Sequence, residues 1–507
     1  MSAIRTPVLL LFIFAAAAAI SAAQSGSNDR EVVQASEILE KIERGEPVNY
    51  VNKVIEGNLS IRDPKHLDVS WRNIRSSRIA IRNCLIKDKV DFSNTQFNDS
   101  VSFSGSTFYG KSDFKGAQFN KDVSFNDSVF LKDASFRVAR FGQDADFIHA
   151  QFSDNLNFGE ANFNHIADFS AATIRKYANF LGVGFNGTAN FQFANFLGRN
   201  SFQEAVFNGT ADFSRVLFDS SAGFSGAVFN DSANFFYAFF DDSSFTGAQF
   251  NKDVDFTLSH FKGYASFSGA QINHSVFFKK AEFRDDAVFD WSFLKSAHFN
   301  QTVILGELSL KGTQIDNLNL SDAEIGGIVL RSWKSIGHME YDEMAYQLLL
   351  SNFRNRNLPD EANECYYDYR EGRRATLSTL SQPADYALML FYGYGVKPER
   401  PVIWAFVFMA IFAALFWWRQ GIIPVQKGEP EEEAARFTLL EAMAFSVMTF
   451  LSGGKLVFDP PEYRIAPGKP WRDVQICKAL FVWERLMGMM LLFMFAVAVT
   501  KTIILGS

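Results

Sequence analysis

Cysteine and histidine are scarce in this chain of 507 residues, which has 3 Cys and 7 His. Cys84, Cys365 and Cys477 lie far apart without paired spacing, which excludes a disulfide framework and a cysteine-rich zinc site. We expect these three residues to be buried apolar filler. The sequence also lacks a His-x-x-x-His pair, a nucleophile–base set, paired carboxylates and a phosphate-binding loop. It therefore predicts no metal site, no cofactor and no enzyme.

Phenylalanine is abundant, with 56 Phe against 8 Trp and 14 Tyr, and it is regularly spaced. From Phe92 to Phe240 a Phe follows the previous one after alternately five and six residues, and Ile174 fills the one missing place. The series slips once near Phe245, resumes to Phe289, and tightens to steps of five from Leu310 to Leu330. Such repetition indicates a repeat architecture.

Neither a continuous helix nor a continuous strand fits this spacing. In a helix, at about 100° per residue, the second Phe of a unit would lie roughly 140° from the first. In a strand, a step of five reverses the face. The spacing fits short extended pieces separated by turns. Each Phe then points inward with the small residue two places before it, such as Ala117, and polar "NGT" and "SG" stretches form the corners.

This pattern resembles the pentapeptide-repeat family, whose motif is Ala-(Asp/Asn)-(Leu/Phe)-x-x. The stretches "ADFSA" (167–171) and "ADFSR" (211–215) match it, and the resemblance covers roughly Lys53 to Leu330. It implies a right-handed quadrilateral β-helix with about 20–22 residues per coil, hence about 11 coils over Phe92–Leu330 and a rod on the order of 50 Å long. Some family members bind topoisomerases by imitating DNA.

The N-terminus has the pattern of a secretory signal peptide. Arg5 precedes an apolar run, Val8–Ile20, and small residues lead to a cleavage site after Ala23. An uncleaved signal anchor is the alternative interpretation. Either one places the repeats outside the cytoplasm, and so we expect no nucleic-acid partner.

Several Asn-x-Ser/Thr sequons follow the repeat Phe residues. Glycosylation outside the cell and simple corner chemistry explain them equally well. The asparagines concerned are Asn98, Asn126, Asn186, Asn208, Asn230, Asn273 and Asn300.

After Leu330 the pattern becomes helical. The segments 341–357 and 358–374 predict a helical hairpin, in which a Tyr cluster with Arg370 packs the helices together or forms a recognition patch. A further helix starts at Pro383. Gly393-Tyr394-Gly395 matches the core of a potassium-channel filter, but it precedes the first apolar span. We therefore interpret it as a helix stop and hinge.

The C-terminal part predicts two membrane spans around a shorter apolar helix. Pro401–Trp418 contains 18 residues without a charge, and the second span covers roughly Ala479–Leu505. Between them, the segment 437–456 offers about 15 helical residues, too few to cross a core of about 30 Å. Such a segment dips into the membrane and returns where protein or water shields its non-helical part.

This order resembles the two-transmembrane pore domain of tetrameric cation channels. "FSVMTF" (445–450) is similar to the pore helix, and "ERLMG" (484–488) is similar to the start of the inner helix. The resemblance implies two groups of site residues. The pore loop or filter equivalent is Thr449, Phe450, Leu451, Ser452, Gly453, Gly454 and Lys455, and the supporting residues are Glu484, Arg485 and Gly488.

The filter equivalent departs from a potassium filter. Such a filter needs a ring of successive carbonyl groups. Gly453 and Gly454 supply part of it, but Lys455 would place four cations near the mouth of a tetramer. We therefore do not expect strict potassium selectivity. Glu484 is interpreted as an anchor of the re-entrant loop, with Arg485 and Lys455 as candidate partners; the alternative is a Glu484–Arg485 pair at the membrane interface.

Charge distribution favours a cytoplasmic segment between the spans, with the repeats on the other side. This segment carries eight Lys or Arg residues, whereas the tail carries only Lys501. The eight are Arg419, Lys427, Arg436, Lys455, Arg464, Lys469, Arg472 and Lys478.

The sequence as a whole predicts five segments and one leading function. The segments are a signal peptide (1–23), an N-terminal helical cap (24–52), the pentapeptide-repeat β-helix (53–330), a helical neck (331–400) and an all-α two-span membrane domain with a re-entrant helix (401–507). The function is that of a homotetrameric, weakly selective or non-selective ion channel in the cell membrane, with an inorganic ion as the permeant and the β-helix as sensor or vestibule. The alternative is a non-conducting cell-surface scaffold or adhesion protein, in which the spans only anchor and oligomerise the β-helix.

Overall fold

The computed structural model describes residues 30–61, 72–74, 78–425, 438–452 and 459–505. The predicted signal peptide (1–23) lies outside the described residues, as do Gly453, Gly454 and Lys455. The chain divides into two compact units at Ala345: an N-terminal β-solenoid and a C-terminal helical unit.

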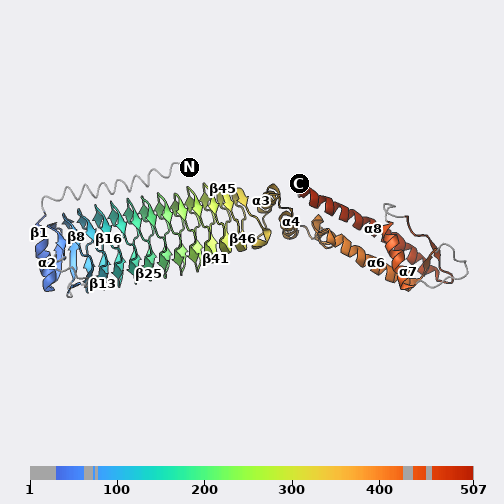
Figure 1. The fold of residues 1–507 in the computed structure, drawn as a ribbon, viewed down its shortest axis with the longest axis horizontal. Helices are drawn as coiled ribbons and strands as arrows, with labels where there is room; N and C mark the ends of the chain where they lie inside the picture. The colour runs from blue at the N-terminus through green and yellow to red at the C-terminus, as the bar shows by residue number, and fades with distance from the viewer. Residues whose placement is uncertain (1–29, 62–71, 75–77, 426–437, 453–458, 506–507) are drawn as a thin grey trace. The chain divides into compact units, whose positions relative to one another are not determined.

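The N-terminal unit is a β-solenoid of about 13 turns. Its described strands run from β1 (Val32–Gln34) to β48 (Ile336–Met339) and form two parallel sheets of 25 and 23 strands (Figure 1). Most strands contain two residues. One coil, for example, contains β11 (Thr107–Phe108), β12 (Ser112–Asp113), β13 (Gln118–Phe119) and β14 (Val123–Ser124). The first two strands belong to one sheet and the last two to the other.

The register confirms the predicted repeat. In β11, Phe108 pairs with Phe130 of β15 (Val129–Phe130) in the next coil, and Ile174 takes the place of a Phe between Phe152 and Phe196. The predicted slip is present, because Ala222 pairs with Ser243, which makes this coil shorter by a single residue than the coils before it. The inner Phe residues and the alanines two places before them are buried, as the alternation of a short strand requires.

Stacked phenylalanine rings fill the solenoid. Phe169 is fully buried and lies face to face with Phe147 and Phe191, at centroid distances of 4.8 and 4.9 Å. Phe158 meets it edge-on at 5.3 Å. Aromatic pairs in these two geometries add about 0.5–1.5 kcal/mol each to the effect of area burial. A two-residue strand has no stability of its own, and so each coil depends on the coils above and below it.

The strands extend beyond the predicted range 53–330 at both ends. β1 pairs with β3 (Val54–Glu56), β2 (Val48–Val51) pairs with β6 (Ile79–Arg82), and β48 pairs with β46 (Gln314–Asn319). These terminal coils use Val, Ile, Tyr and Met as inner residues, and a search for spaced Phe does not detect them. The helix α2 (Ala35–Arg44) lies within the first coil, so the segment predicted as a helical cap (24–52) also contains solenoid strands.

Glycine is needed at the corners for two different reasons. Gly105, in an "SG" corner, has φ +66°, in the left-handed region that favours glycine. Gly209, in an "NGT" corner, lies against the preceding coil, where an added Cβ would come within 2.6 Å of the Gly187 backbone. The sequence predicted corners of "NGT" and "SG" stretches, and both kinds are present.

The "NGT"-type corners carry a ladder of asparagine side chains. Asn208 donates from Nδ2 to Asn186 Oδ1 at 2.8 Å, and its own Oδ1 accepts from Asn230 Nδ2 at 2.7 Å. The ladder continues through Asn251 to Asn273. The sequon asparagines Asn186, Asn208, Asn230 and Asn273 therefore act as corner residues that join consecutive coils.

The C-terminal unit is helical. Its elements are α3 (Glu343–Asn355), which begins just before the boundary, α4 (Pro359–Arg374), α5 (Gln382–Tyr392), the 3-10 turn η2 (Gly393–Gly395), α6 (Glu399–Arg419), β49 (Ile422–Pro424), α7 (Leu439–Leu451), β50 (Tyr463–Ile465) and α8 (Trp471–Leu505) (Figure 1). Among the described residues, Glu399–Arg419 and Trp471–Thr500 are long and apolar enough to cross a membrane. The shorter α7 packs against both α6 and α8.

We expect Phe169→Ala to destabilise the solenoid by about 3–5 kcal/mol, because it leaves a cavity where three rings meet. Phe193→Ala is the matched control. Phe193 is 46% exposed and lies under the Arg215 guanidinium at 5.1 Å, so its loss should cost no more than about 1 kcal/mol. Denaturant unfolding of the full chain, followed by far-UV circular dichroism, measures both. Equal effects of the two substitutions would contradict a core built on ring stacking.

Candidate functional site

The short helix α7 has a well-defined start. Thr438 accepts a hydrogen bond from the Glu441 backbone, and the Glu441 side chain accepts from the Thr438 backbone, which forms a capping box. Thirteen residues follow, which corresponds to about 20 Å of helix. Ala442, Phe445 and Phe450 are buried, whereas Leu440 and Met443 on the other side are exposed. The helix therefore packs one face within the unit and leaves an apolar face uncovered.

A polar cluster joins α6, α7 and α8 inside this unit. It consists of Met409, Ser446 and Glu484. The Ser446 Oγ lies 2.8 Å from the Met409 carbonyl oxygen of α6 and also contacts Glu484 Oε1 of α8. Ser446 and Glu484 are fully buried, and no hydrogen-bond partner of Glu484 Oε2 is found among the described residues. Because buried polar groups are costly when unpaired, this cluster fixes which faces of the three helices meet.

One turn further along α8, at Gly488, this helix approaches the backbone of α7 closely. A Cβ added to Gly488, one turn after Glu484, would lie 2.1 Å from the Phe450 carbonyl oxygen. Only glycine permits this approach of α8 to the end of α7. Glu484 and Gly488, which the sequence named as supporting residues, thus both face α7. Arg485 instead donates to the Ser452 carbonyl at 3.5 Å and lies beside the Phe481 ring at 5.7 Å.

The described part of the predicted pore loop is the end of α7. Thr449 is fully buried, with no hydrogen-bond partner of its hydroxyl found in the described part of the chain. Leu451 is the last residue of the helix, and Ser452 caps it by donating from Oγ to the Thr449 carbonyl at 2.7 Å. Gly453, Gly454 and Lys455 lie outside the described residues. The structure therefore brings Phe450 against Gly488 and Ser452 close to Arg485, both on α8.

In the middle of α7, the buried Phe445 packs on an aromatic cluster. Phe445 meets Phe416 of α6 edge-on at 5.3 Å and Phe481 of α8 at 5.9 Å. Tyr463 of β50 contacts Phe481 at 4.9 Å, and Arg419 pairs with Asp473 at 3.0 Å. The two ends of the connection between the helices are held together by the antiparallel pairing of β49 with β50.

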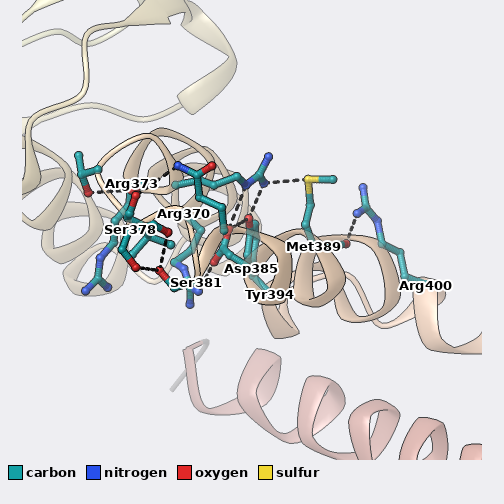
Figure 2. Close-up of polar contacts among 12 residues, drawn as sticks. Arg370, Arg373, Ser378, Ser381, Asp385, Met389, Tyr394 and Arg400 are labelled. Carbon is teal, nitrogen blue, oxygen red and sulfur yellow. Dashed lines mark hydrogen bonds and ion pairs between the residues drawn. The ribbon is translucent and has the colours of Figure 1, made fainter.

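A second polar site, which sequence reasoning missed, lies around Asp385 (Figure 2). Asp385 is 4% exposed and accepts hydrogen bonds from Arg370 at 2.9 Å, Arg374 at 3.0 Å and the Tyr394 hydroxyl at 2.6 Å. Arg374 also contacts the Tyr394 hydroxyl, and the Arg370 guanidinium lies 4.6 Å from the Tyr394 ring. The network joins α4, α5 and η2.

Two pKa values reflect this network. Burial opposes ionisation of Asp385, but the hydrogen bonds from Tyr394, Arg374 and Arg370 outweigh it and lower the pKa of the carboxyl group. Burial raises the pKa of Tyr394 to about 12. At neutral pH the site is therefore an ionised carboxylate held by two arginines and a neutral phenol.

The Gly393-Tyr394-Gly395 turn ends α5, as the sequence predicts. All three residues have positive φ, of +58°, +57° and +83°. Gly393 caps the helix in the left-handed conformation. Tyr394 is not glycine, and its hydrogen bond to Asp385 offsets the strain. Arg400, at the start of α6, donates to the Met389 carbonyl of α5 (Figure 2) and to the Tyr367 hydroxyl of α4, and thus ties both helices to α6.

The hairpin residues pack as the first of the two interpretations states. Tyr369 of α4 contacts Tyr346 of α3 at 5.7 Å, whereas the contact of Arg370 with Tyr366, at 3.4 Å, lies within α4. All three cysteines are buried and free, as expected from their spacing.

We expect Asp385→Asn to lower the stability of the helical unit by about 3 kcal/mol, because two arginines lose their counter-charge. The low pKa of Asp385 implies that its contribution is present above the ordinary carboxyl value of about 3.9 and is lost as pH falls through the lower folded value. Thermal unfolding in detergent between neutral and acidic pH measures this, with exposed Glu371→Gln as control. An unchanged acid profile in Asp385→Asn would contradict it.

Comparison with known proteins bears on the solenoid. The family described as "Pentapeptide repeats (9 copies)" matches residues 81–129 and 125–173. No curated protein matches the chain. Among solved structures, the chain is similar to HetL, a pentapeptide repeat protein involved in heterocyst differentiation regulation from the cyanobacterium Nostoc sp. strain PCC 7120. The two share 15% identity over 59% of this chain and 97% of that one, with a TM-score of 0.17. The β-solenoid of this chain is thus built, at least over residues 81–173, from pentapeptide repeats.

Proposed function

We propose that the helical unit is a channel-like membrane domain which assembles as a homotetramer, and that it conducts inorganic ions with weak selectivity. The observation that carries the proposal is the geometry of α7. It is an apolar helix of 13 residues, too short to cross the membrane, and it is fixed by polar and close-packed contacts between two helices that are long enough to cross. This is the expected arrangement of a re-entrant helix beside a pore.

The uncovered apolar faces support both the proposed membrane location and the proposed tetramer. Only 22% of the apolar window of each candidate span is buried within the unit. Phe406 on α6, Met448 on α7 and Phe493 on α8 are among the large apolar side chains that remain exposed. Exposed apolar surface of this extent requires lipid or further copies of the chain. In the proposed tetramer, some of these faces contact lipid and the others contact neighbouring subunits.

In the proposed pore, the end of α7 leads into the filter-equivalent segment Leu451–Lys455. Backbone carbonyl groups of this segment would line the path, and four copies of Lys455 would lie near its mouth. The positive charge opposes strict cation selectivity. Thr449 and Ser452 come from the described end of α7, where Ser452 caps the helix.

The solenoid completes the proposal. We place it outside the cytoplasm, as a four-sided rod that acts as sensor or vestibule. The signal-like N-terminus and the basic segment between the spans both favour this orientation.

We expect the purified full chain to give ohmic currents in planar lipid bilayers. Lys455→Gln should shift the reversal potential in a salt gradient toward the cation value, because it removes four positive charges from the mouth of a tetramer. The exposed Lys469→Gln is the matched control and should leave the reversal potential unchanged. Silence from a verified tetramer would reject conduction and favour the scaffold in which the spans only anchor and oligomerise the solenoid.

Labelling with a membrane-impermeant thiol reagent tests the re-entrant course of α7. The natural cysteines are buried, so they should give little background. Arg436→Cys and Arg464→Cys, which flank α7, should be labelled from the same side of the membrane. Leu380, in the loop before α5, is 92% exposed, and Leu380→Cys should be labelled from the other side. Labelling of positions 436 and 464 from opposite sides would show that α7 crosses the membrane.

A further inference from the structure

The polar cluster of Met409, Ser446 and Glu484 requires more hydrogen atoms than an ionised Glu484 provides. The Ser446 hydroxyl has one hydrogen, yet its oxygen lies at hydrogen-bond distance from two other oxygens, the Met409 carbonyl (2.8 Å) and Glu484 Oε1. If the hydroxyl donates to one of them, the other contact needs a second hydrogen. A carbonyl oxygen cannot supply it. A protonated Glu484 can, by donating to Ser446 Oγ while Ser446 donates to Met409.

The described surroundings of Glu484 supply no counter-charge. Among the described residues of α6, α7 and α8, no cationic group forms an ion pair with it. Arg485 is directed to the Ser452 carbonyl and the Phe481 ring, and Arg419 pairs with Asp473. The nearest acid on α7, Glu441, is used in the capping box. An ionised carboxylate at zero exposure without a cationic partner would cost several kcal/mol.

The same contacts argue against a metal cation as the occupant. The described residues contain no group of three or more His, Cys, Asp or Glu side chains that could hold a metal ion. Glu484 is the one carboxylate of the cluster, and its oxygen touches the serine oxygen directly. A hydrogen atom between the two oxygens explains this contact without further ligands.

We propose that Glu484 is a buried proton-binding site, and that the bound proton holds α7 between α6 and α8. The proton completes a chain of hydrogen bonds from Glu484 through Ser446 to the Met409 carbonyl. Its loss would leave a negative charge at zero exposure, where Glu484 Oε2 already has no hydrogen-bond partner among the described residues. Alkaline conditions should therefore loosen the contact of α7 with its neighbours.

This inference concerns the helical unit of the proposed function but is independent of conduction. If the unit conducts, the proton is a means to regulate the position of α7, and alkaline pH should change the open probability. If it does not conduct, the proton still determines the stability of the unit. The two can fail separately, because neither measurement below depends on current.

Infrared spectroscopy of the full chain in lipid nanodiscs tests the proton directly. At neutral pH, the difference spectrum of wild type minus Glu484→Gln should contain the carbonyl band of a protonated carboxyl group, and the band should shift in D2O. The exposed Glu462→Gln should produce no such band. A difference spectrum with only carboxylate bands would overturn the proposal.

Unfolding against pH gives a second, independent measurement. Raising pH from neutral to alkaline should lower the unfolding midpoint of the wild type more than that of Glu484→Gln, which is neutral at every pH and keeps a hydrogen for Ser446. Glu462→Gln should follow the wild type. Identical pH profiles of wild type and Glu484→Gln would overturn the proposal. So would a midpoint raised by Na⁺ or K⁺ at constant ionic strength in the wild type alone, because a metal cation would then be the occupant.

Discussion

The direct stacking of each inner phenylalanine on its equivalent one coil earlier is the interaction on which the solenoid depends. Strands of two residues bury almost nothing by themselves, and their backbone hydrogen bonds run to neighbouring coils. The rings provide the apolar area, and the register from coil to coil brings most inner Phe residues into contact with a Phe of the next coil. The corners follow from this requirement. They must return the chain within a few residues, which explains the left-handed glycines and the asparagine ladder.

The helical unit is organised by the opposite kind of contact. Its large apolar faces point outward, and polar groups specify the packing inside. The Ser446–Glu484 contact and the Gly488–Phe450 approach set the position of α7, while Asp385 with its two arginines orders the turn before α6. In a lipid environment the hydrophobic effect does not drive helices together, so close packing and hydrogen bonds must determine which faces meet. This unit meets that requirement.

How much the sequence predicted depended on the kind of signal. Spaced Phe residues predicted the strands, the inner alanines, Ile174 as a substitute and the slip near Phe245, because a repeated inward position leaves a periodic trace. The terminal coils around Val32 and Ile336 were missed, since other apolar residues replace Phe there. Hydropathy predicted α6, α7 and α8. The Asp385 network was missed, because its members are spread from Arg370 to Tyr394 and meet only through the turn. The one available hint was an acidic residue inside an otherwise apolar helical segment.

Each coil contributes strands first to one sheet and then to the other, and this alternation has a consequence for the evolution of rod length. Equivalent inner residues recur once per coil within one sheet, and those of the other sheet are offset by half a coil. Duplication or loss of a whole coil would lengthen or shorten the rod by that coil and leave every remaining ring on an equivalent partner. Gain or loss of half a coil would transfer all following strands to the opposite sheet. Gene-level gain and loss in this protein should therefore proceed in whole coils, each worth about 4.8 Å of reach.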